Sequence, residues 1–192
     1  MREARRENAE ADEVRDWSVV RGYVLRIGER IRGEEQAHAQ AGIIVAGKQG
    51  KEAEMADIRQ VTDQFAVAPQ IALEDFALLK GLGFSHVISN RPDGESADQP
   101  SAAAAEAAAI TAGLTFVHAP FVGQPTAEAV KAVMAAKGKT LAFCRSGTRS
   151  VTAWAMAQAS AGAQGRDIVA AAAGAGYNLG SMADLLRQLG AR

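Results

Sequence analysis

From Met55 to the C-terminus, short apolar runs alternate with longer stretches whose apolar residues recur at helical spacing. The short runs predict strands, of which the first two can pair as a hairpin: Ile58–Thr62, Ala66–Ala68, His86–Ser89, Leu114–Ala119 and Lys139–Phe143. The stretches between and after them predict helices: Leu73–Leu82, Ala102–Ala112, a helix capped by Thr126, and helices over 148–161, 166–174 and 180–189. Strand–helix alternation of this kind indicates an α/β fold, with a mostly parallel sheet of four to five strands and helices on both faces.

Residues 1–54 differ from the rest because charged residues are much more frequent there. Apolar residues between Val14 and Ile31 recur at partly helical spacing, which is typical of an amphipathic helix. We therefore predict two parts: a charged N-terminal extension over residues 1–54, partly helical or disordered, and a catalytic domain over residues 55–192. A true start of translation at Met55 is an alternative interpretation of the same boundary.

Composition narrows the class of protein. Hydrophobic residues make up 48% of the 192, enough for a core. A net charge of −1 gives no reason to expect nucleic acid or anionic lipid as a partner. No stretch approaches the roughly 20 apolar residues of a membrane-spanning helix, and the N-terminus lacks a secretory pattern, so we expect a cytoplasmic protein without membrane contact. The single cysteine excludes an internal disulfide and a multi-cysteine zinc site, and we expect no metal and no cofactor.

One segment carries recognisable chemistry: Cys144-Arg-Ser-Gly-Thr-Arg-Ser150, between a predicted strand and a predicted helix. In a parallel α/β sheet such a loop lies at the carboxyl ends of the strands, where ligands bind. Backbone N–H groups of the loop and of the first helical turn then converge on one point and favour an anion. Gly147 allows the backbone to turn inward. The spacing predicts an anion-binding loop with Cys144 and Arg149 at its two ends.

The residue types in this loop suit covalent catalysis. Helix N-termini and nearby arginines lower a thiol pKa from ~8.5 to about 3.5–7.5, so a cysteine placed there can be a thiolate at neutral pH. We predict that Cys144 attacks phosphorus or sulfur, that Arg149 binds two oxygens of a tetrahedral oxyanion, and that Ser150 donates a hydrogen bond to the departing sulfur. The remaining loop residues are candidates for substrate binding: Arg145, Ser146, Gly147 and Thr148. The plain alternative is that the cysteine is a small buried hydrophobic residue at the end of a strand.

Two loop motifs and their surroundings resemble a known family. They are Ser89-Asn-Arg-Pro-Asp-Gly-Glu95 and Phe143-Cys-Arg-Ser-Gly-Thr-Arg-Ser150, with Gly83-Phe84 and Ala112-Gly-Leu before two of the strands. Residues 55–190 thus resemble the phosphatase-like domain of the beta-lactamase hydrolase-like proteins, bacterial relatives of the dual-specificity protein tyrosine phosphatases. The resemblance implies a protein tyrosine phosphatase-like fold, a cysteine nucleophile at Cys144 and an oxyanion-binding arginine at Arg149.

Two departures from the phosphatase pattern affect the expected chemistry. Four residues separate Cys144 from Arg149, whereas protein tyrosine phosphatases have five, and the shorter loop is similar to that of single-domain rhodaneses. Phosphatases also place an aspartic acid on a movable loop to protonate the leaving oxygen, but the corresponding residues 120–125 contain no acid. Asp93 is our candidate general acid, with Glu95 as a neighbour that can also approach the site. The alternative is that such carboxylates fix turns or pair with arginine.

Three functions remain open on the sequence. The first is a phosphatase-like hydrolase with a covalent cysteinyl intermediate. The second is a rhodanese-like sulfurtransferase that forms a persulfide on the same cysteine and needs no general acid. The third is a module that binds an anion or a partner without catalysis. Both enzymatic hypotheses predict a small anionic substrate, which is a phosphate ester for the hydrolase and thiosulfate or a persulfide for the sulfurtransferase. The sequence gives no prediction for the oligomeric state.

Overall fold

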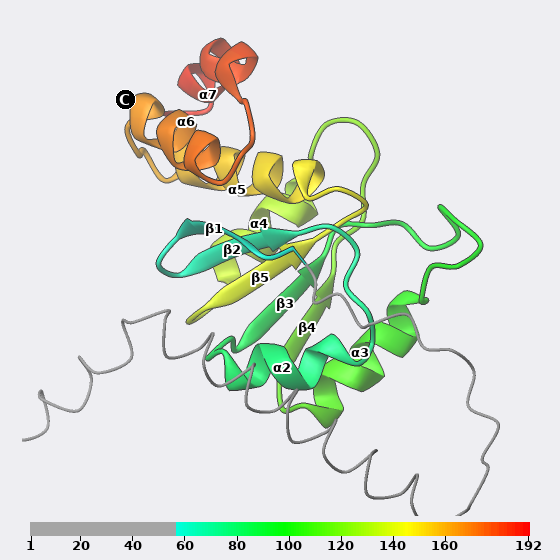
Figure 1. The fold of residues 1–192 in the computed structure, drawn as a ribbon. Coiled ribbons are helices and arrows are strands. Elements are labelled where there is room, and N and C mark those ends of the chain that lie inside the picture. The colour runs from blue at the N-terminus through cyan, green and yellow to red at the C-terminus, as the bar shows by residue number, and fades with distance from the viewer. Residues whose placement is uncertain (1–56) are drawn as a thin grey trace, which may run out of the picture. The chain divides into compact units, whose positions relative to one another are not determined.

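The computed structural model describes residues 57–192, and the predicted N-terminal extension lies outside these residues. Five strands form one sheet in the order β1-β2-β5-β3-β4, in which only the β1–β2 pair is antiparallel. Their bounds are β1 Arg59–Thr62, β2 Phe65–Ala68, β3 His86–Ser89, β4 Thr115–His118 and β5 Thr140–Phe143. The predicted parallel sheet with an N-terminal hairpin is confirmed (Figure 1).

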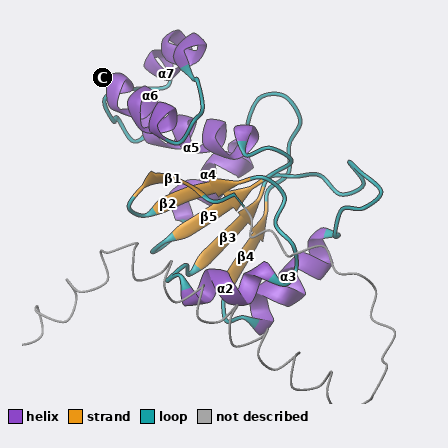
Figure 2. Cartoon of the chain, in the orientation of Figure 1, coloured by secondary structure: helices purple, strands orange, loops and turns teal. Residues whose placement is uncertain are grey.

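Six α-helices and one 3₁₀ helix surround the sheet within the described residues (Figure 2). Their bounds are α2 Asp75–Gly81, α3 Ala102–Thr111, α4 Ala127–Ala135, α5 Thr148–Ser160, α6 Gly165–Gly174, η1 Gly180–Met182 and α7 Ala183–Gln188. Two of these helices have an N-cap side chain that forms a hydrogen bond. Thr126 Oγ1 accepts a hydrogen bond from the N–H of Ala129, as predicted, and Ser101 Oγ accepts one from the N–H of Ala104. Within residues 57–192 no helix has the length and apolar character that crossing a bilayer requires.

The sheet buries both of its faces, because successive side chains of a strand point to opposite sides. In β2, Phe65 and Val67 belong to one apolar cluster and Ala66 and Ala68 to the other. The first cluster is shared with α4, α5, α6 and α7, and the second with α2 and α3. Figure 1 shows these two groups of helices on opposite faces of the sheet. This arrangement explains why β2 and most of β3 and β5 are continuous apolar runs and not alternating ones.

The strand register brings the candidate residues to one edge of the sheet. Phe143 at the end of β5 pairs with Ala68 of β2 and with Ser89 of β3, and Ser89 pairs with His118 of β4. Four parallel strands therefore end on one line, and the chain leaves each at the same edge. The loops that follow β3, β4 and β5 gather there, which is where ligands bind in open α/β sheets.

Candidate active site

The loop after β5 turns directly into α5. Cys144 follows the last residue of the strand, and Gly147 is the N-cap of the helix, with φ of +84°. A side chain would be strained in this left-handed conformation. It would also have no room, because a Cβ on Gly147 would lie 2.0 Å from the hydroxyl oxygen of Tyr177. Glycine is therefore required here for both reasons.

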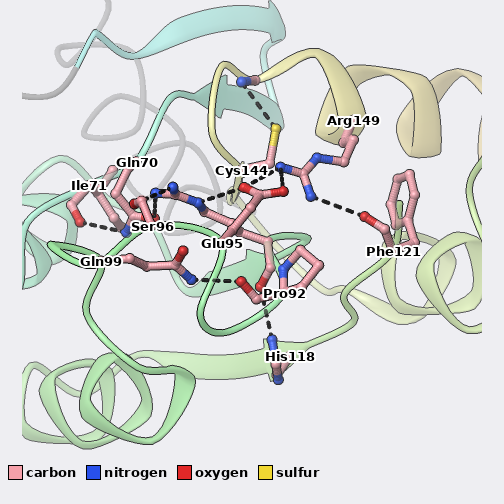
Figure 3. A network of polar contacts seen from close by, with 12 residues as sticks. Gln70, Ile71, Pro92, Glu95, Ser96, Gln99, His118, Phe121, Cys144 and Arg149 are labelled. Atoms are coloured by element: carbon pink, nitrogen blue, oxygen red, sulfur yellow. Dashed lines mark hydrogen bonds and ion pairs between the residues drawn. The ribbon is translucent and has the colours of Figure 1, made fainter. Parts of the chain in front are cut away.

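The Cys144 side chain is buried but has a polar contact. Its Sγ accepts a hydrogen bond from the backbone N–H of Gly147 at 3.1 Å (Figure 3). Burial alone would also fit the alternative of a small hydrophobic core residue. Cys144 belongs to neither apolar cluster, however, and its sulfur faces a main-chain donor at the start of a helix. Such a donor stabilises negative charge on sulfur.

Arg149 lies in the first turn of α5 and is held from two sides. Its Nη1 donates to the carbonyl oxygen of Phe121 at 3.0 Å, and its Nη2 lies 2.8 Å from both carboxylate oxygens of Glu95. Figure 3 shows the guanidinium between these two partners, close to the loop that carries Cys144. Only 16% of the Arg149 side chain is exposed. The arginine is thus fixed by the loops that follow β3 and β4.

Glu95 links Arg149 to a second arginine. The buried Arg91 donates from Nε to the Glu95 carboxylate at 2.9 Å and from its other two nitrogens to Gln70 and Ser96, both at 2.8 Å. The hydrogen bond from Arg149, followed by that from Arg91, lowers the pKa of Glu95 despite its partial desolvation. Glu95 is therefore a carboxylate at neutral pH, and the two guanidinium groups leave this cluster with net positive charge. An anion is favoured there.

Comparison with known proteins assigns the chain to a family. Residues 57–161 match the family described as beta-lactamase hydrolase-like protein, phosphatase-like domain. The match covers more than half of the 192 residues. The chain belongs to this family.

Members and structural neighbours of the family share parts of this chain to different extents. A beta-lactamase hydrolase-like protein of Xylella fastidiosa (strain Temecula1) is 31% identical over 137 residues, which cover 68% of this chain but only 32% of the relative. A "putative phosphatase" of Neisseria meningitidis z2491 is 29% identical with a TM-score of 0.60, and the alignment covers 69% of this chain and 97% of that one. A kinase associated phosphatase superposes with a TM-score of 0.57 at 15% identity, covering 71% and 95% of the two chains.

These neighbours confirm the predicted protein tyrosine phosphatase-like fold. A phosphatase-like fold with a buried cysteine fits a cysteine-based phosphatase. The chain spans about a third of the length of the beta-lactamase hydrolase-like relative. The rest of that longer protein lies outside the match.

The structure places the other predicted loop residues at the surface or in the core. Arg145, Ser146 and Thr148 are exposed, and the hydroxyl of Ser146 donates to that of Thr148 at 3.1 Å. Ser150 is fully buried, and its Oγ has no hydrogen-bond partner among the described residues. A buried hydroxyl without a partner costs roughly 1–3 kcal/mol.

Asp93 contacts the start of a helix. Its Oδ1 accepts the N–H of Ala102 at 2.7 Å, the first residue of α3. The carboxylate thereby satisfies one of the unpaired donors at a helix start. Within residues 57–192, no cluster of three or more His, Cys, Asp or Glu side chains suits a metal ion.

Two contributors were not found from the sequence. The carbonyl of Phe121 binds Arg149, and a backbone atom has no sequence signal. The hydroxyl of Tyr177 donates to the carbonyl of Ser146 at 3.1 Å from a turn 31 residues downstream. Its only sequence signal is its place in the glycine-rich segment 174–180, between the helices predicted over 166–174 and 180–189.

Proposed function

We propose that this chain is a cysteine-dependent phosphatase-like hydrolase that acts through a covalent intermediate on Cys144. The thiolate attacks phosphorus, and an S–P bond forms while the bond to the leaving oxygen breaks. That oxygen takes up a proton from solvent water. A second water then attacks phosphorus and releases a proton to solvent, the S–P bond breaks, and orthophosphate leaves while the sulfur returns as a thiolate.

The contact that carries the proposal is the hydrogen bond from the Gly147 N–H to Cys144 Sγ. It supports the thiolate before attack and again when the sulfur leaves. Arg149 lies two residues further on, in the first turn of α5, and its partners among the described residues accept from Nη1 and Nη2. A guanidinium has five N–H donors, so others remain for the equatorial oxygens of a transferring phosphoryl group.

The remaining loop residues have supporting parts in this proposal. Arg145 is an exposed cation beside the nucleophile and adds attraction for a small anionic substrate. The main chain of Ser146, Gly147 and Thr148 supplies donors for the bound anion. The Ser150 hydroxyl donates a hydrogen bond to the sulfur as the S–P bond breaks. This bond gives a partner to a buried hydroxyl that otherwise has none among the described residues.

Sulfur transfer is the second candidate, because the acids near the site are poorly suited to donate a proton. Glu95 is ionised and shared by two arginines, and Asp93 is engaged with the start of α3. A rhodanese-like reaction avoids this requirement. The thiolate takes the outer sulfur of thiosulfate, sulfite leaves with the electron pair of the broken S–S bond, and a thiolate acceptor then removes the sulfur from the persulfide.

Mass spectrometry of the intact protein distinguishes these functions. The chain is incubated separately with an aryl phosphate and with thiosulfate, with C144S as the control. We expect the chain to turn over the aryl phosphate. Vanadate should inhibit this turnover, and C144S should lack it. An added sulfur on Cys144 without phosphate turnover would reject the hydrolase and support sulfur transfer. Absence of both reactions would leave a non-catalytic anion-binding module.

A further inference from the structure

Tyr177 contacts the nucleophile loop from a part of the chain that lies beyond the family match over residues 57–161. It follows Gly176 in the turn after α6, and only 7% of its surface is exposed. Its hydroxyl donates to the carbonyl oxygen of Ser146 at 3.1 Å. Burial raises the pKa of Tyr177, so the hydroxyl keeps its proton and remains a donor at neutral pH.

The acceptor of this bond belongs to the peptide unit that faces the sulfur. The carbonyl of Ser146 and the N–H of Gly147 are the two ends of one peptide group. In a planar trans peptide these two bonds point in opposite directions. Tyr177 therefore binds one end of the group, and Cys144 Sγ accepts from the other end at 3.1 Å. The orientation of this single peptide decides whether its N–H reaches the sulfur.

Little else within residues 57–192 fixes that orientation. Gly147 is the N-cap of α5, but no side chain caps the helix through a hydrogen bond. Glycine also has access to more backbone conformations than any other residue, so the peptide on its N-terminal side can rotate at low cost. A carbonyl that turned away from Tyr177 would carry the N–H away from Cys144.

We propose that Tyr177 is a positioning residue that holds the Ser146–Gly147 peptide with its N–H toward Cys144 and so sustains the thiolate. The inference rests on the proposed function, in which that thiolate is the nucleophile. A donor on the carbonyl also polarises the peptide and strengthens its N–H as a donor. Packing supports the same role: a Cβ on Gly147 would lie 2.0 Å from Tyr177 Oη and 2.9 Å from Cζ, and the Arg59 guanidinium lies 5.2 Å from the ring centroid.

The test is a titration of the sole cysteine in the wild type and in Y177F. The thiolate is followed by its ultraviolet absorbance, because this measurement needs no reagent to reach a buried thiol. The C144S substitution in each background serves as the blank. Phenylalanine keeps the ring and its packing and removes only the hydroxyl. T140V is the matched control, because Thr140 is also a buried residue whose hydroxyl donates to a main-chain carbonyl at 3.1 Å, but at the opposite end of β5.

We expect Y177F to raise the titration midpoint by about one pH unit, which is about tenfold less thiolate on the acidic side. The acid limb of kcat/KM should move with it, and T140V should leave both unchanged. A wild-type midpoint near the free-thiol value of ~8.5 would reject the proposed function and leave no thiolate for Tyr177 to support. A low wild-type midpoint that Y177F does not move, or that T140V moves equally, would overturn this inference alone.

Discussion

Replacement of Gly147 by alanine tests the geometry of the nucleophile loop most directly. The new Cβ would meet the Tyr177 hydroxyl at 2.0 Å and its ring carbon Cζ at 2.9 Å, and it would stand on a backbone with φ of +84°. Because distances below 3.0 Å are not tolerated between such atoms, the tyrosine or the loop has to move. Either movement breaks the hydrogen bond from Tyr177 to Ser146.

A matched control variant separates the backbone strain of G147A from the cost of its contact with Tyr177. Gly83 has φ of +81° in the turn before β3, and a Cβ there would meet nothing within 4 Å. G83A therefore carries only the backbone strain, about 1–2 kcal/mol. G147A adds overpacking of roughly 1–3 kcal/mol and a lost hydrogen bond of about 1 kcal/mol. We expect G147A to lower the free energy of unfolding by about 2–4 kcal/mol more than G83A.

Urea unfolding of the two variants and the wild type measures this difference, provided that the m-values agree. In a Y177F background the extra cost of G147A should shrink, because the atom at 2.0 Å is then absent. Equal destabilisation by G147A and G83A would mean that Tyr177 does not pack against this turn, and the reasoning would be refuted.

Substitutions at three further residues test the charged network and the start of α3. R149K should lower kcat by about 10²–10³, since an ammonium cannot bridge two oxygens as a guanidinium does; steady-state kinetics with an aryl phosphate measure this loss, and wild-type turnover would exclude Arg149 from oxyanion binding. Because the pKa of Glu95 is lowered, its ion pairs stabilise the fold at any pH above the ordinary glutamate pKa of 4.5. This stabilisation is lost as the pH falls through the lowered pKa. The stability gap between wild type and E95Q should therefore narrow between neutral and acidic pH in urea unfolding, and a constant gap would contradict the ion-pair assignment. D93N keeps an acceptor for the N–H of Ala102 and should retain turnover and stability, whereas D93A should lose about 1 kcal/mol of unfolding free energy; a loss of turnover in D93N alone would instead identify Asp93 as the general acid.

Local sequence information was sufficient for the elements of this fold. Apolar runs and caps predicted the described strands and helices to within a few residues, including the helix that Thr126 starts. The exception is the single helix predicted over 180–189, which is divided into η1 and α7. The loop from Cys144 to Arg149 was also predicted in place, because its residues are close in sequence and lie at a strand–helix junction. These features depend on hydrogen bonds and side-chain periods within a few residues of each other, and a single chain segment contains them.

The partners of that loop were decided only by the tertiary structure. Glu95 lies 54 residues before Arg149, and Tyr177 lies 31 residues after Ser146. They meet because β5 is inserted between β2 and β3, so that the loops after β3, β4 and β5 end at one edge, and because the turn after α6 packs back onto the start of α5. Strand order and helix packing are set by burial of the whole core, and no local pattern in the chain specifies them.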